Sequence, residues 1–238
     1  MTPLLLLPGL VCDRAIWAPL LPALAPHAQC SVADYGRLDS LAAMAAHVLA
    51  TAPPRFALAG HSMGGRVALE VMRAAPQRVE RLALLDTGYQ SRMPGLPGAA
   101  ETAQRYGLLD IARREGMRAM GEKWLTGMLP PARLADTALV DAIADMVARH
   151  SSDIFAAQIE ALLTRPDATE VLRSIACPTL IACGRLDAWS PFARHQEIAR
   201  LVKGATLSAF EGCGHMAPME DPESVAAALV GWMQASFV

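Results

Sequence analysis

The chain has 238 residues, of which 53% are hydrophobic and 18% are charged. This composition is too apolar for a disordered protein, and the formal net charge of −2 gives no electrostatic reason to expect nucleic acid or an anionic membrane as a partner. The five cysteines lack metal-ligand spacing, and no apolar run approaches the roughly 18 residues of a membrane span. We therefore expect a cytoplasmic globular protein that binds a small molecule and uses no metal.

Short apolar runs that end at turn residues predict six strands, at residues 3–7, 30–33, 56–59, 82–85, 179–182 and 206–210. Segments of helical period lie between these runs. Strand and helix thus alternate, which predicts an α/β fold with a mostly parallel sheet and helices on both of its faces. A last helix is predicted to begin at Asp221, as its N-cap, with Pro222 in its first turn.

The segment of residues 88–169 differs from the rest of the chain. It opens with a stretch rich in proline and glycine at residues 94–98 and then shows only helical periodicity. Helices are predicted at residues 99–106, 108–125, 134–148 and 152–163. We interpret this segment as a helical cap, or lid, inserted into a core formed by residues 1–87 and 170–238.

One motif carries a candidate nucleophile. The sequence Gly60-His61-Ser62-Met63-Gly64 matches G-x-S-x-G, follows the predicted strand 56–59 and precedes a helix. Glycines two positions either side of the serine allow a turn tight enough to expose its side chain, and the helix N-terminus favours developing negative charge. This context predicts that Ser62 is an activated nucleophile.

A serine hydroxyl needs a base to accept its proton, and that base needs an acid to orient it. His215 follows the predicted strand 206–210, and Asp187 follows the predicted strand 179–182. Both positions lie at carboxyl ends of strands, where open α/β sheets place their sites. Asp86, at the end of the strand 82–85, is the alternative acid. We expect His61 to pack beneath the turn rather than to act as the base.

The oxyanion formed during serine attack requires backbone N–H donors. One donor is expected to be the amide of Met63, directly after the nucleophile, and the other the amide of Leu10, in the loop after the first strand. Gly9 allows the backbone of that loop to approach closely.

With these motifs, the chain resembles the α/β-hydrolase family over nearly its whole length. The resemblance implies a sheet of about six strands that lacks the family's first two, and a Ser62–His215–Asp187 triad that works without a cofactor. The family's common His-Gly pair after the first strand is Pro8-Gly9 here, so the contribution of that histidine is missing, although the backbone donor need not be.

Serine at position 62 excludes the aspartate-nucleophile branch, and Gly60-His61-Ser62 differs from the Gly-Asn-Ser that is usual in carbon–carbon bond hydrolases. We therefore expect a carboxylic ester hydrolase acting on small to medium esters, lactones or thioesters. The sequence Ser62-Met63-Gly64-Gly65-Arg66 also looks like the elbow of enol-lactone hydrolases and of a menaquinone-pathway lyase, so carbon–carbon bond cleavage or lyase chemistry remains an alternative. A non-catalytic small-molecule receptor is a further alternative.

Apolar residues of the cap and of the loops are candidates for an acyl pocket. Because methionine adapts to irregular shapes, we expect Trp124, Met128, Met146 and Met216 to contribute to substrate binding.

Overall fold

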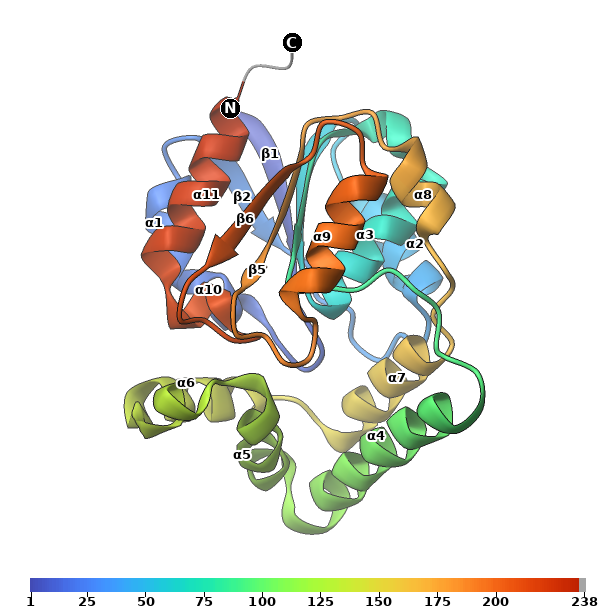
Figure 1. Ribbon diagram of the computed structural model, residues 1–238, viewed down its shortest axis with the longest axis vertical. Coiled ribbons are helices and arrows are strands. Elements are labelled where there is room, and N and C mark those ends of the chain that lie inside the picture. Colours follow the sequence, from blue (N-terminus) through green and yellow to red (C-terminus); the bar gives the residue numbers. More distant parts are fainter. Residues whose placement is uncertain (236–238) are drawn as a thin grey trace.

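A computed structural model describes residues 1–235 of the chain. Six parallel strands form one sheet in the order β2-β1-β3-β4-β5-β6 (Figure 1). Their bounds are β1 (Thr2–Leu7), β2 (Ala28–Val32), β3 (Phe56–His61), β4 (Val79–Leu85), β5 (Thr179–Gly184) and β6 (Thr206–Phe210). The six strands predicted from apolar runs are thus confirmed, each within a few residues of its predicted bounds.

The inner strands are mostly apolar because helices cover both faces of the sheet. Every residue of β3 and β5 is buried, whereas the edge strands β2 and β6 have one buried residue each. The strands are in parallel register, for example Leu6 of β1 beside Ala59 of β3 and Ala59 beside Ala83 of β4. All carboxyl ends therefore meet at one edge of the sheet.

Helices pack on the two faces as two layers (Figure 1). One layer holds α2 (Leu41–Thr51), α3 (Met63–Ala74), α8 (Thr169–Ser174) and α9 (Phe192–Leu201), and the other holds α1 (Leu21–Leu24) and α11 (Pro222–Gln234). The Asp221 side chain accepts a hydrogen bond from the Ser224 amide at 3.1 Å, so the predicted N-cap of the last helix is confirmed. The short elements are η1 (Arg14–Ile16), η2 (Ala18–Leu20), η3 (Pro76–Arg78) and α10 (Ala217–Glu220).

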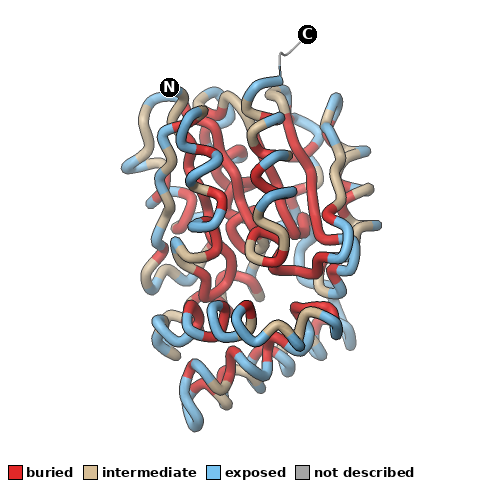
Figure 2. The backbone as a smooth tube through the Cα atoms, turned by 90° about the vertical axis from the view of Figure 1, so that its left-hand side faces the viewer, coloured by how far each residue is buried: buried red, intermediate tan, exposed pale blue. Residues whose placement is uncertain are grey.

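The remaining helices lie across the carboxyl edge of the sheet (Figure 1). These cap helices are α4 (Gly95–Glu115), α5 (Met117–Met128), α6 (Thr137–Ala148) and α7 (Ser152–Leu163), with η4 (Pro131–Ala135) between α5 and α6. Figure 2 shows that the outward sides of these helices are exposed, while the sheet beneath them is buried. Within residues 1–235, no helix is long and apolar enough to cross a membrane.

The first two cap helices were predicted with the wrong boundary. The break expected at Gly107 falls inside α4, and the chain turns instead at Gly116, where φ is +95°. Gly107 has helical geometry and open space around it, so nothing forces an interruption there. A residue with a side chain is strained at a positive φ, which makes Gly116 the natural end of α4. Pro97 is tolerated because it lies in the first turn of the helix.

Candidate active site

The turn from β3 into α3 presents Ser62 at the carboxyl edge of the sheet. Ser62 has φ +55° and ψ −117°, a strained combination for a residue with a side chain. The turn closes so tightly that a Cβ on Gly60 would lie 2.4 Å from the Gly64 carbonyl oxygen, and a Cβ on Gly64 would lie 2.1 Å from the Leu7 carbonyl oxygen. Glycine at both positions is therefore a steric requirement for this backbone.

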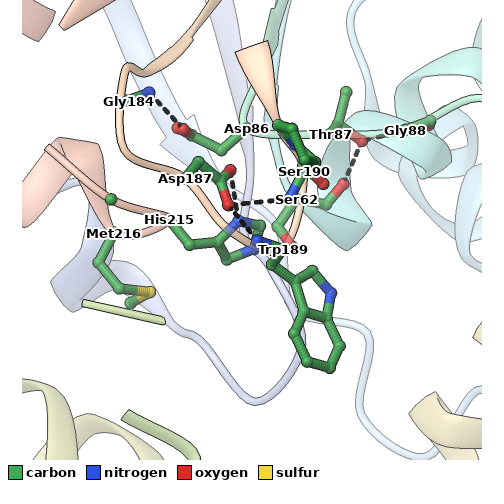
Figure 3. Close-up of polar contacts among 12 residues, drawn as sticks. Ser62, Asp86, Thr87, Gly88, Gly184, Asp187, Trp189, Ser190, His215 and Met216 are labelled. Carbon is green, nitrogen blue, oxygen red and sulfur yellow. Dashed lines mark hydrogen bonds and ion pairs between the residues drawn. The ribbon is translucent and has the colours of Figure 1, made fainter. Parts of the chain in front are cut away.

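Ser62, His215 and Asp187 form a hydrogen-bonded line (Figure 3). Ser62 Oγ lies 2.8 Å from His215 Nε2, and the other ring nitrogen, Nδ1, lies 2.8 Å from Asp187 Oδ2. Three different strand ends supply these side chains, since Asp187 follows β5 and His215 follows β6. The arrangement can pass a proton from the serine hydroxyl to the imidazole while a carboxylate stabilises the charged ring.

The second oxygen of Asp187 fixes the orientation of its carboxylate. Oδ1 accepts hydrogen bonds from the amides of Trp189 and Ser190, both at 2.8 Å. Burial by itself raises the pKa of Asp187, but the His215 ring and these two amides outweigh it and hold the pKa below its ordinary value. Asp187 is therefore ionised at neutral pH although it is buried.

Asp86, the alternative acid, is placed differently. Its Oδ1 accepts a hydrogen bond from the Gly184 amide at 2.8 Å, and its Oδ2 has no hydrogen-bond partner among residues 1–235 (Figure 3). Burial, and next the negative charge of Asp187, raise the pKa of Asp86 well above its ordinary value. The structure thus joins Asp187, not Asp86, to His215, and it leaves Asp86 as a buried carboxyl whose charged form is disfavoured.

Two backbone amides near Ser62 are candidates for an oxyanion hole. The Met63 amide is the first of helix α3, where N–H groups have no partner within the helix. Leu10 belongs to the loop after β1, and both residues line the same cavity as Ser62. The loop is held by Gln158 of the cap, whose Oε1 accepts a hydrogen bond from the Val11 amide at 2.7 Å. Val11 itself has φ +46°, so this loop stores strain next to the site.

Hydrogen bonds hold the backbone around His215 from several sides. The His215 amide donates to the carbonyl oxygen of Met128, the last residue of α5, at 2.8 Å, so the cap touches the loop directly. The Glu220 carboxylate accepts hydrogen bonds from both neighbouring amides of that loop. From below, His61 Nε2 donates to the His215 carbonyl oxygen at 2.8 Å. Burial, followed by the nearby His215, lowers the pKa of His61 to about 3, so His61 is a neutral support for the loop.

A cavity of about 300 Å³ opens onto Ser62 and is bounded by the cap helices and by Trp189. Of the four residues expected to bind substrate, the structure places only Trp124 along this cavity. Met128, Met146 and Met216 are at most 1% exposed and pack within the hydrophobic core. Other residues therefore line the cavity.

Those residues include four arginines, which the sequence analysis did not identify as site residues: Arg66, Arg105, Arg165 and Arg194. For Arg66 a signal existed, because it follows Ser62 by four positions at the start of α3 and therefore shares its helix face. The other three come from α4, the end of the cap and α9, and no local pattern links them. Among residues 1–235, no group of three or more His, Cys, Asp or Glu side chains is placed to hold a metal ion.

A serine, an aspartate and a histidine in this chain order, with the serine on a strained strand-to-helix turn, are the arrangement expected of a serine hydrolase on an α/β sheet. The comparison with known families agrees with this class. A sequence profile described as "Alpha/beta hydrolase family" matches residues 4–228, so the chain belongs to the α/β-hydrolase family.

Individual relatives within this family have different activities. The chain is 40% identical over 89 residues to a pimeloyl-[acyl-carrier protein] methyl ester esterase of Pectobacterium carotovorum, a match that covers 34% of the chain and 35% of that protein. It is 28% identical over 191 residues to a 2-hydroxy-6-oxononadienedioate/2-hydroxy-6-oxononatrienedioate hydrolase of Pseudomonas putida, covering 79% of the chain and 62% of that protein. The chain thus spans less than two thirds of either curated relative.

The solved structure of a thermophilic esterase from Thermogutta terrifontis is similar over nearly the whole chain. The two share 26% sequence identity with a TM-score of 0.85, and the match covers 98% of this chain and 90% of the esterase. Hydrolases, among them esterases, are therefore the proteins that this chain resembles in both sequence and fold.

Proposed function

We propose that the protein is a serine hydrolase that cleaves a small to medium carboxylic ester, lactone or thioester through an acyl-enzyme. The observation that carries this proposal is the line of hydrogen bonds from Ser62 through His215 to Asp187, with Ser62 lining a cavity. Esterases among the related proteins support the same reaction class. No cofactor takes part in this chemistry.

The proposed steps follow from the geometry. Ser62 Oγ attacks the ester carbonyl carbon while His215 Nε2 takes the hydroxyl proton, and Asp187 stabilises the imidazolium. The amides of Met63 and Leu10 donate to the resulting oxyanion. The intermediate collapses, His215 returns the proton to the departing alcohol, and an ester links the acyl group to Ser62. A water molecule then repeats the sequence and releases the acid.

We also propose that residues 88–169 act as a cap inserted between two parts of the core, residues 1–87 and 170–238. Two contacts support this role. Gln158 of α7 holds the loop of Leu10, and the Met128 carbonyl at the end of α5 holds the backbone of His215. The cap thus contacts the loops of both the oxyanion donor and the base, and it would exclude water from the reacting ester.

The direct test is a substrate panel read against Ser62→Ala. The panel contains activated esters of several acyl lengths, a lactone, a thioester and an amide, and labelling by a fluorophosphonate is measured in parallel. We expect the wild type to hydrolyse at least one ester and to be labelled, and Ser62→Ala to lose both properties while keeping its melting temperature. Undiminished hydrolysis by Ser62→Ala would refute the proposal.

Carbon–carbon bond hydrolysis or lyase chemistry is the second candidate, because the relative from Pseudomonas putida is named as a hydrolase of a 2-hydroxy-6-oxo dienedioate. A vinylogous diketone in the same panel distinguishes it: cleavage of the diketone with a much higher kcat/KM than any ester would favour this reading. A third candidate, a non-catalytic receptor, predicts slow or absent labelling of Ser62 by the fluorophosphonate.

A further inference from the structure

The cavity at Ser62 carries an excess of positive charge. Its walls hold Arg66, Arg105, Arg165 and Arg194, and among residues 1–235 the carboxyl groups that line it are those of Glu101 and Asp86. Burial raises the pKa of Asp86 well above its ordinary value, which disfavours its charged form. Four guanidinium groups therefore face two carboxyl groups, and the charged form of one of these, Asp86, is disfavoured by its burial.

Two of the arginines share one carboxylate. Glu101 accepts hydrogen bonds from both Arg165 Nη atoms, each at 2.7 Å, and from Arg105 Nη2 at 2.9 Å. The Arg105 and Arg165 side chains are only 7% and 9% exposed, which fits an internal ion cluster. This cluster is a structural element of the cavity wall, and its one carboxylate is fully occupied.

The other two arginines are not neutralised. Within residues 1–235, neither Arg66 nor Arg194 lies within 4.0 Å of a carboxylate oxygen, and their recorded hydrogen bonds go to the backbone carbonyls of Gln90 and Trp189. Their side chains converge beside Gly88, because a Cβ there would lie 2.6 Å from Arg66 Nη2 and 3.3 Å from Arg194 Cδ. A side chain at position 88 would block this point, whereas glycine keeps it open.

Charge repulsion makes this arrangement costly without an anion. Burial, and next the charges of Arg165, Arg194 and Arg105, lower the pKa of Arg66 to about 9, so the group stays charged at neutral pH while its charge is unfavourable. An anionic group next to Arg66 would compensate for the burial of its charge and offset the repulsion by the other arginines. Guanidinium groups bind carboxylate and phosphate oxygens through paired hydrogen bonds, which suits such a partner.

We propose that Arg66 and Arg194 form an anion subsite of the cavity, and that the substrate is an ester with a second, negatively charged oxygen group, a carboxylate or a phosphate, at a distance from the bond that Ser62 attacks. This inference rests on the proposed function for its ester, but the subsite itself can be tested by binding. Arginines thus line the cavity beside Trp124, together with Met63 and Met93, whereas the expected Met128, Met146 and Met216 do not.

The kinetic test compares monomethyl with dimethyl esters of succinic, glutaric and adipic acids, which differ in one charge but share their acyl chains. We expect kcat/KM for at least one monomethyl ester to exceed that of its dimethyl ester by about tenfold or more. Arg66→Gln and Arg194→Gln should each reduce this ratio by about tenfold, mainly by raising KM for the charged ester. Arg200→Gln is the matched control, because Arg200 is an exposed arginine of α9 that does not line the cavity.

A binding test separates the subsite from the reaction. The melting temperature of Ser62→Ala is measured with glutarate and with propyl phosphate, and then in the double variants with Arg66→Gln and Arg200→Gln. We expect at least one of the two anions to raise the melting temperature, and we expect Arg66→Gln but not Arg200→Gln to abolish the rise. The anion that gives the larger rise shows whether the subsite prefers a carboxylate or a phosphate. If the anion stabilises the protein in this way but the wild type cleaves no ester, the proposed function is refuted and the anion subsite is retained.

The opposite pattern would overturn the subsite and leave the proposed function intact. It consists of hydrolysis of the dimethyl esters with no preference for any monomethyl ester, together with no stabilisation by either anion. A preference that stays unchanged in both Arg66→Gln and Arg194→Gln would overturn it equally.

Discussion

Replacing Asp187 with asparagine separates the charge of this side chain from its position. Asp187 Oδ1 accepts hydrogen bonds from the amides of Trp189 and Ser190, both at 2.8 Å, so the carbonyl oxygen of an asparagine must occupy that place. Its NH2 group then faces His215 Nδ1 at the position of Oδ2. An NH2 group accepts no hydrogen bond, so the ring would present a lone pair at Nδ1 and carry its proton on Nε2.

In that tautomer, the proton points at Ser62 Oγ, 2.8 Å away, and the base cannot take the serine proton. Loss of the correct tautomer lowers kcat by roughly 10⁴-fold in an enzyme with a Ser-His-Asp triad, which corresponds to about 5.5 kcal/mol of activation free energy. We expect a loss of this size in kcat for an activated ester, with an unchanged melting transition. Asp86→Asn is measured alongside, and a loss there that equals or exceeds the loss in Asp187→Asn would refute the assignment of the acid.

Two further predictions follow from buried contacts. The pKa of Asp86 is raised well above 3.8, so the folded protein holds a proton that the unfolded chain loses. Folding stability therefore falls as the pH rises above 3.8. Relative to wild type, Asp86→Asn should gain up to about 1.4 kcal/mol of unfolding free energy per pH unit. Urea unfolding of both proteins at a series of pH values from about 4 upward measures this, and unfolding free energies that run parallel over the whole series would contradict it. Gln158→Leu leaves the Val11 amide unpaired and should lower kcat about tenfold, whereas Gln158→Glu keeps the acceptor and most of the rate; equal rates in both variants would exclude a role of this contact.

The sequence predicts the sheet and the catalytic loops because their signals are local. The inner strands are short apolar runs, since helices cover both faces of the sheet. The elbow needs glycine at position 60 because the turn itself is tight, and at position 64 because α3 lies close to the Leu7 carbonyl of β1. Chain order and the carboxyl ends of parallel strands then bring Asp187 and His215 to the same edge as Ser62. The spacing alone leaves Asp86 as a competitor, and only the hydrogen bonds separate the two acids.

The cap is less predictable because helical periodicity does not say what each face meets. Met128 and Met146 have the residue type of a pocket but pack into the core, while Arg105 looks like a solvated residue and is buried beside Glu101. The helix end at Gly116 rather than Gly107 depends on backbone conformation, which the identity of the residue does not reveal. Specificity therefore depends on tertiary contacts, and the arginines of the cavity become apparent only once four distant segments are folded together.

The central claim, that Ser62 forms a covalent acyl intermediate, is tested most directly by the mass of the protein during turnover. The enzyme is mixed with p-nitrophenyl acetate, quenched with acid, and analysed intact and after peptide mapping. We expect one acetyl group, located on Ser62, and no adduct in Ser62→Ala. Acetylation of a different residue, or turnover that continues in Ser62→Ala with no adduct, would contradict the account.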